Sequence, residues 1–93
     1  MGRLETTLQR ELSRLIPTLT DPRVPVVVTV ERVRLSPDGR QAKVLVSALD
    51  EDEGEMLAAL NGAGGYLQRE LAAELDLRYT PKLSFFTDEL KVL

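Results

Sequence analysis

Arginine and lysine are the side chains best placed to do chemistry in this chain, which has twelve of them and neither histidine nor cysteine. The missing residue types exclude disulfides, thiol chemistry and histidine acid–base catalysis, and leave no nitrogen or sulfur ligands for zinc. The remaining carboxylates, such as Asp38 and Asp88, show no spacing that would pair them. We therefore expect a binding protein and not an enzyme, with no cofactor and no metal.

The net charge of −3 conceals a basic half. Residues 1–49 carry eight Arg and Lys against five Asp and Glu, whereas residues 50–93 carry four against ten. A phosphate backbone responds to the local field of a surface, so the first half remains suited to nucleic acid. Five of the acids fall in the run from Asp50 to Glu55, which we interpret as a solvated loop leading into a helix N-terminus.

Several cations share predicted surfaces. Helical spacing places Arg3, Arg10 and Arg14 on one stripe, and strand alternation gives Arg32 and Arg34 the same side. The candidate RNA-binding residues are Arg3, Arg10, Arg14, Arg23, Arg32, Arg34, Arg40, Lys43 and Arg69. For the helix stripe, the alternative is a solvated face with Arg10 near Glu11 and Arg14 free. For the hairpin cluster, the alternative is charge that protects an edge strand. Arg78 and Lys82 stand near acids and are interpreted as ordinary solvated residues.

The first half of the chain predicts a helix followed by a hairpin. Leucines at spacings of three and four predict an amphipathic helix over about 3–16, ended by Pro17. Residues 26–35 predict a strand, and a change of parity within it indicates a bulge near Glu31 and Arg32. "SPDG" (36–39) has strong turn chemistry and leads into a second alternating strand over 42–48.

The second half predicts helices and a last strand. Leucines before and after a glycine cluster predict two helical segments between Met56 and Leu75, and "KLSFF" (82–86) begins a strand with Leu83 and Phe85 facing inward. We therefore expect one α+β domain over 1–93, in which helices cover one face of a three-stranded sheet. The charged start of the chain shows no signal peptide or membrane span, which points to the cytoplasm.

The glycine cluster "NGAGG" (61–65) lies where a helix is expected, and each glycine inside a helix costs about 1 kcal/mol relative to alanine. One interpretation is a kink or a close approach of two elements. The other is a GXXG loop, as in KH domains, whose backbone meets a phosphate chain. If the cluster serves packing alone, alanine at Gly64 and Gly65 lowers stability and RNA binding together. If it contacts RNA, binding falls more than stability.

Only four aromatic residues are available for stacking on bases: Tyr66, Tyr79, Phe85 and Phe86. We expect Phe85 in the core and the Tyr66 ring packed beside Leu67. Recognition of RNA shape and backbone is therefore favoured over sequence-specific base contacts.

The segment "LNGAGGYLQREL" (60–71) resembles the helix–kink–helix of the ribosome-binding factor A family, in which an Ala-x-Gly kink replaces the GXXG loop. Ala63, Gly64 and Gly65 match that pattern. The segments "TDPRVP" (20–25), "VRLSPDGRQAKVLVSAL" (33–49) and "LRYTPKLSFFTDE" (77–89) resemble the family's Asp-Pro-Arg turn, hairpin and final strand. The resemblance extends over roughly residues 3–89.

The resemblance implies a type II KH-like domain of order α-β-β-α-(Ala-x-Gly kink)-α-β. It implies a bacterial, non-catalytic assembly factor that binds the free 30S ribosomal subunit, assists late 16S rRNA processing and matters most in the cold. We expect a monomer that binds no membrane. The acidic run either keeps its side of the domain away from RNA or faces a basic ribosomal protein. The alternative is a general single-stranded RNA or DNA module that uses Gly62–Gly65 as its loop.

The chain departs from the family pattern in two respects. It is acidic overall, which is expected to weaken electrostatic affinity for RNA. The sequence also stops at Leu93 without the basic C-terminal extension of many members, so no contact from such a tail is expected.

Overall fold

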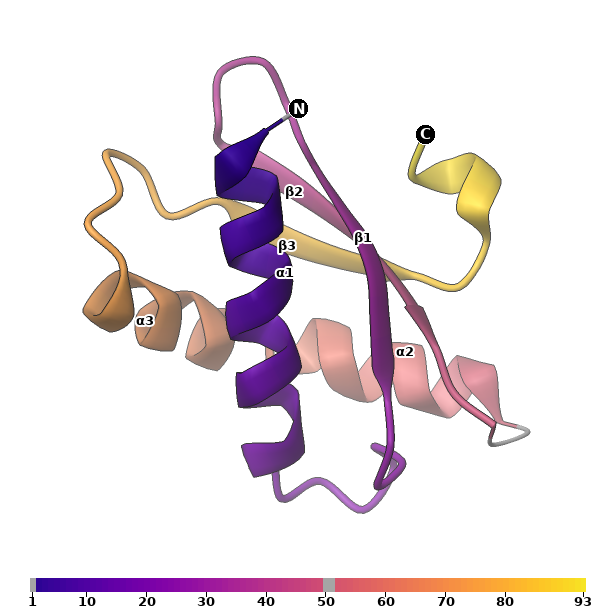
Figure 1. Cartoon of the computed structure of the whole chain (residues 1–93). Coiled ribbons are helices and arrows are strands. Elements are labelled where there is room, and N and C mark those ends of the chain that lie inside the picture. The colour runs from indigo at the N-terminus through magenta and orange to yellow at the C-terminus, as the bar shows by residue number, and fades with distance from the viewer. Residues whose placement is uncertain (1, 50–51) are drawn as a thin grey trace.

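The computed structural model describes residues 2–49 and 52–93, and its elements follow the predicted α+β order (Figure 1). Helix α1 (Arg3–Leu15) continues into a 3₁₀ turn, η1 (Ile16–Thr18), which contains Pro17. The remaining elements are β1 (Thr29–Leu35), β2 (Gln41–Ser47), α2 (Glu53–Gly62), α3 (Gly64–Glu74), β3 (Lys82–Phe86) and a 3₁₀ turn, η2 (Glu89–Lys91). None of the helices formed by these residues is long and apolar enough to cross a bilayer.

The three strands form one sheet in the order β1-β2-β3. Strand β1 is antiparallel to β2, and β3 is parallel to β2, so α2 and α3 form the crossover that a parallel pair requires. The predicted bulge is confirmed, because the register shifts between Val30 and Arg32. It lets Val30 and Val33 both face the core despite their odd spacing, and turns Arg32 and Arg34 to the opposite face.

The hairpin turn has the predicted chemistry. The Gly39 N–H donates to the Ser36 carbonyl at 2.9 Å, and Gly39 has a φ of 75°, the left-handed conformation that favours glycine. The Asp38 carboxylate accepts hydrogen bonds from the Ser36 hydroxyl at 2.7 Å and the Arg40 N–H at 3.0 Å. These bonds hold the pKa of Asp38 below its usual value and fix the shape of the turn.

The first strand is shorter than predicted, because it begins at Thr29 and not at residue 26. Val26 and Val27 are 92% and 72% exposed. Strand β2 ends at Ser47, opposite Thr29, so no partner strand remains for residues 26–28. The run of valines has strand propensity, but the end of the pairing decides where the strand starts.

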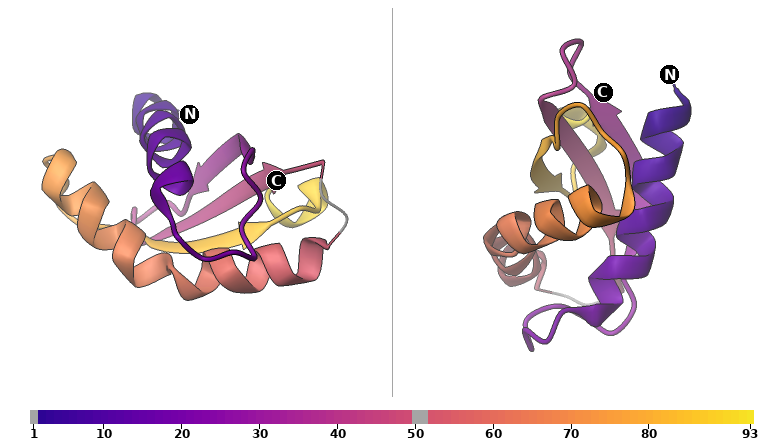
Figure 2. Two further views of the ribbon diagram at one scale, coloured as in Figure 1. Left: turned by 90° about the horizontal axis from the view of Figure 1, so that it is seen from below. Right: turned by 90° about the vertical axis from the view of Figure 1, so that its left-hand side faces the viewer.

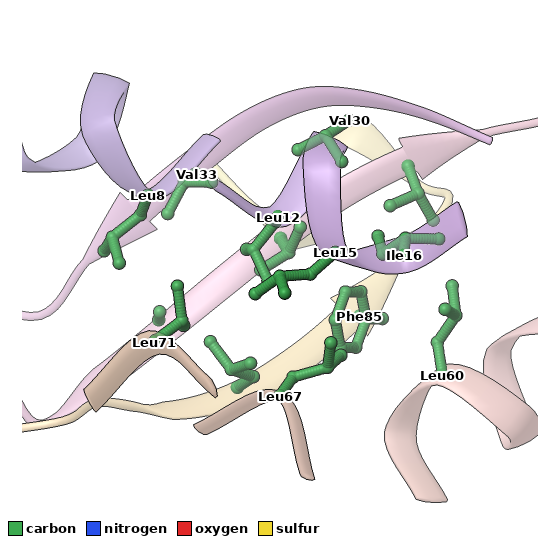
Figure 3. Packing of buried hydrophobic residues seen from close by; sticks show 14 of the residues in the cluster. Leu8, Leu12, Leu15, Ile16, Val30, Val33, Leu60, Leu67, Leu71 and Phe85 are labelled. Atoms are coloured by element: carbon green, nitrogen blue, oxygen red, sulfur yellow. The ribbon is translucent and has the colours of Figure 1, made fainter. Parts of the chain in front are cut away.

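All three helices pack on one face of the sheet, and most of the buried side chains form one cluster (Figure 3). Leu45, at an outward position of β2, and Val92 are buried outside this cluster. Helix α1 contributes Leu8, Leu12 and Leu15, and α3 contributes Leu67 and Leu71, each at most 3% exposed. The strands add Val30, Val33, Ala42, Val44, Val46, Leu83 and Phe85. The core positions of Leu8, Leu12, Leu15 and Phe85 are thus confirmed, whereas Leu4, at the start of the same leucine pattern, is 38% exposed.

Side chains from the helices satisfy both edges of the sheet. At β1, the Leu35 N–H donates to Glu5 Oε2 at 2.8 Å, and Gln9 Nε2 donates to the Val30 carbonyl at 2.9 Å. At β3, the Phe85 N–H donates to Asn61 Oδ1 at 2.9 Å. Because exposed edges invite pairing with other chains, covering them is a protective device. The arginines of β1 are therefore not needed for edge protection.

Candidate nucleic-acid interface

Four cations lie on the face of the sheet that points away from the helices: Arg32, Arg34, Lys43 and Lys82. We call this set the outer basic face. Arg34 pairs directly with Lys43 across β1 and β2, and Lys82 pairs with Gln41 at the next outward position of β2. Arg34, Lys43 and Lys82 are exposed and Arg32 is half-buried. No salt bridge joins any of them to an acid in the part of the chain that the structure describes.

The cross-strand pair of Arg34 and Lys43 lowers the stability of the sheet. Like charges directly opposite each other on neighbouring strands repel and destabilise a sheet. A phosphate placed between the two would convert this repulsion into attraction. The outer basic face is therefore suited to an anionic ligand.

The sequence interpretation of Lys82 as a solvated residue agrees with its exposure, and the structure adds its position on the outer basic face. The inward positions of Leu83 and Phe85 already imply that Lys82 and Ser84 point outward. Its proximity to Lys43 depends on the parallel register between β2 and β3, which no local pattern contains.

A groove of about 270 Å³ lies on the surface between α1 and β1. It is lined by Gly2, Glu5, Thr6, Gln9, Glu31, Arg32, Val33 and Arg34. Arg3 and Arg10 stand three and four residues from Thr6, so they are its neighbours on the exposed surface of α1. The two arginines of β1 therefore line the groove, whereas Arg3 and Arg10 do not line it and lie beside Thr6 by helical spacing.

Arg14 differs from these arginines because it forms ion pairs with acids. Its guanidinium lies 2.8 Å from Glu11 and 3.6 Å from Glu74 of α3. The hydrogen bonds that Arg14 donates to Glu11 are the main reason why the pKa of Arg14 is raised. The alternative in which Arg14 is free is therefore wrong, and its charge is already partly balanced.

Arg23 is engaged in the turn that precedes β1. Its Nε and Nη2 atoms donate to the two carboxylate oxygens of Asp21 at 3.1 and 2.8 Å. These bonds, followed by one from the Arg23 backbone N–H, lower the pKa of Asp21 from 3.8 to about 2. Both residues are solvent-exposed enough for the pair to be screened by salt.

We expect Arg23→Gln to raise the pKa of Asp21 from about 2 toward 3.8. A lowered pKa gives stability that is present above the unfolded value of 3.8 and is lost as the pH falls toward 2. Between these values the wild type keeps a turn contact that the variant lacks. An NMR titration of the Asp21 carboxyl carbon measures this. Asp38, held by Ser36 and the Arg40 backbone, is the internal control. An unchanged Asp21 pKa would contradict the assignment.

The kink allows both α2 and α3 to pack along β3, and Figure 2 shows the bend between the two helices. Asn61 binds the backbone of Phe85, and Gln68 Nε2 donates to the Pro81 carbonyl at 2.9 Å. Between them, buried Gly64 lies close to the Leu83 carbonyl. Strands twist, so a straight helix of this length would leave β3, and the kink at Ala63 restores the contact.

The glycines of the kink do not need their conformational freedom. Gly39 is the residue with positive φ among those described, and a Cβ added at Gly64 would lie 3.9 Å from the Leu83 oxygen, an ordinary contact. Alanine therefore fits at Gly64, which corrects the expectation that it would lower stability. Arg69 places its guanidinium over the kink, because a Cβ at Gly65 would lie 3.7 Å from Arg69 Nη1.

The last candidate, Arg40, lies where the hairpin approaches the segment before β3. Its guanidinium carbon is 4.5 Å from the centre of the Tyr79 ring.

The Tyr66 ring is 39% exposed, so the expected burial beside Leu67 is incomplete. At the opposite end of the sheet, Asp52 caps α2 by accepting from the Glu55 N–H at 3.0 Å, whereas Asp50 and Glu51 lie outside the described residues. The described residues contain no cluster of acids that could hold a metal ion.

Comparison with known protein families gives a match over residues 1–91 to ribosome-binding factor A. The chain is 50% identical over 90 residues to ribosome-binding factor A of Nitrosococcus oceani, covering 94% of this chain and 70% of that protein. It is 37% identical over 92 residues to ribosome-binding factor A of Clostridium novyi, covering 96% and 76%.

Solved structures agree with the sequence comparison. The crystal structure of Thermus thermophilus ribosome-binding factor A superposes with a TM-score of 0.81 at 42% identity, covering 92% of this chain and 96% of that one. A homology model of the same factor, fitted into a cryo-EM map of its complex with 30S, has a TM-score of 0.78 at 42% identity and covers 92% of each chain.

Proposed function

The chain belongs to the ribosome-binding factor A family, and from this premise we propose that it binds the free 30S ribosomal subunit and assists late processing of 16S rRNA. It does so in the cytoplasm of a bacterium, as a monomeric single domain without catalysing a reaction, and matters most in the cold. The outer basic face is the observation that carries this proposal.

The outer basic face suits folded RNA because its cations project from backbone positions that the sheet fixes. Strands β1, β2 and β3 are hydrogen-bonded to one another, so the spacing of Arg34, Lys43 and Lys82 is set before any ligand arrives. Several preorganised cations release counterions together when they meet phosphates. Arginine adds planar, bidentate hydrogen bonding to phosphate oxygens. Such a surface reads the shape of an RNA backbone more than its sequence.

The distribution of charge also orients the molecule. The first turn of α2 carries Glu53 and Glu55, both exposed, on the side of the sheet opposite to the outer basic face. Repulsion between these acids and phosphates keeps that side away from RNA. A basic ribosomal protein is a suitable neighbour for it. An overall acidic chain can therefore bind rRNA through one face.

The alternative, a single-strand module that uses Gly62–Gly65 as its loop, has less support. The Ala63 N–H already donates to the carbonyls of Ala59 and Leu60, and Gly64 is buried. A phosphate-binding loop needs free N–H groups that point to solvent. The packing of the kink against β3 therefore favours the 30S proposal.

Co-sedimentation tests the proposal. The purified chain is centrifuged with isolated small subunits, large subunits and joined ribosomes across a salt series. We expect salt-sensitive binding confined to free small subunits. Equal binding to every particle and to short single-stranded RNA would favour the general module. Absence of binding to all of them would overturn both.

A genetic test addresses the processing role. In a bacterium that lacks its own family member, expression of this chain should restore growth at low temperature and reduce unprocessed 16S rRNA. A chain that binds small subunits but restores neither would have to act on a different assembly step.

A further inference from the structure

The hairpin end of the molecule carries an exposed aromatic ring with two guanidinium groups close to it. Arg40 lies 4.5 Å and Arg78 lies 5.6 Å from the centre of the Tyr79 ring. The ring is 42% exposed, and both arginines are exposed. Neither arginine forms a salt bridge with an acid among the residues that the structure describes. We call Arg40, Arg78 and Tyr79 the tyrosine shelf.

The tyrosine shelf borders a hollow of about 400 Å³. The lining combines the hairpin turn from Leu35 to Gly39 with Leu4, Leu77, Arg78 and Tyr79. Leu4 is 38% exposed, so the hollow has an apolar surface open to solvent. Its rim contains the Asp38 carboxylate, whose negative charge repels a phosphate. A flat, uncharged, aromatic ligand fits this combination better than an anion does.

We propose that the tyrosine shelf and its hollow bind one unpaired nucleobase of RNA. Bases stack on tyrosine rings and on arginine guanidinium planes, and such stacking tolerates any base because each has a π-face. The hollow accepts the edge of the base, and Leu4 and Leu77 remove apolar surface from water. The inference rests on the proposed function for the source of the RNA.

The tyrosine shelf and the outer basic face are joined through the backbone at the hairpin end of the sheet. The Lys82 N–H donates to the Arg40 carbonyl at 2.9 Å, so the last cation of that face and the first arginine of the shelf are joined through the backbone. An RNA strand that passes around the hairpin end of the sheet would meet both Lys82 and the shelf. The hairpin turn, fixed by Asp38, keeps Arg40 in place before the base arrives.

A fluorescent RNA tests the shelf independently of the ribosome. The probe is a short uridine oligonucleotide with one central 2-aminopurine, whose fluorescence is quenched when it stacks. We expect wild type and Tyr79→Phe to quench it, because both have the ring. Tyr79→Leu should bind it about tenfold more weakly, equally at every salt concentration, since stacking does not release counterions. Arg40→Gln should reduce the quenching as well.

The control is Tyr66→Leu, which removes a ring of similar exposure, 39%, that has no cation–π contact within the described residues. It should bind the probe like wild type. Urea unfolding shows that each variant is folded before it is titrated.

The two proposals fail in different ways. If wild type does not quench the probe, or if Tyr79→Leu quenches it equally, the tyrosine shelf is not a base site and its contacts only join the hairpin to the segment before β3. That result leaves co-sedimentation with small subunits unaffected. If quenching is observed but small subunits are not bound, the shelf stands and the proposed function falls.

Discussion

Replacing Arg34, Lys43 and Lys82 together with glutamine is expected to lower affinity for small subunits about a hundredfold at physiological salt. Each phosphate contact adds roughly 0.7–0.9 to the slope of log affinity against log salt, so the triple variant should lose about 2 from that slope. Co-sedimentation or fluorescence titration across a salt series measures both quantities. The three side chains share one exposed face, so their loss removes its central charges.

The stability of the triple variant should rise slightly or stay unchanged, although its affinity falls. The variant removes the like-charge pair of Arg34 and Lys43, whose repulsion opposes folding. We expect the free energy of unfolding to stay constant or to rise by a few tenths of a kcal/mol. A loss of binding with intact stability separates a binding role from a structural one.

A matched control uses cations that are already paired. Arg14→Gln with Arg23→Gln removes two exposed charges whose partners are Glu11 and Asp21. Surface ion pairs contribute little to stability, and their arginines are less available to phosphate. The double variant should retain most of the salt slope. If it loses affinity in proportion to its charge, net charge and not the outer basic face controls binding.

The fold was largely predictable because its determinants are local. The spacing of Leu8, Leu12 and Leu15 places one stripe of a helix in the core, and the "SPDG" turn places glycine where φ is positive. The parity change around Glu31 needs a bulge if both halves of the strand are to face the same core. Each of these features is contained in fewer than twenty consecutive residues.

The site was less predictable because it depends on contacts between distant segments. Lys82 joins Lys43 through a register between strands that are separated by two helices. Arg40 meets Tyr79 across the same separation, and Arg14 meets Glu74 of α3. Composition identified the basic half, but spacing within one element cannot show which cations are paired and which remain free.

Gly64→Leu is the single substitution from which we expect a large loss of stability without any change in the charge of the surface. Gly64 is buried where α3 comes closest to β3, so Gly64→Leu has to displace one of these elements. Overpacking of this kind costs about 1–3 kcal/mol. Gly64→Ala fits at 3.9 Å from the Leu83 oxygen and should stay within about 1 kcal/mol of wild type, on the stabilised side. Gly62→Leu is the control, because nothing lies within 4 Å of a Cβ there. Urea unfolding measures all three.

The same positions show whether the kink touches RNA. Gly65 is exposed, and a Cβ there meets only the end of the Arg69 side chain, so Gly65→Ala leaves the fold intact. The kink packs on the helical side of the sheet, opposite to the outer basic face. If binding uses that face, Gly64→Ala and Gly65→Ala should bind small subunits like wild type, whereas Gly64→Leu should lose binding only in proportion to its unfolded fraction. Weaker binding by Gly65→Ala at unchanged stability would mean that the backbone of the kink meets a phosphate.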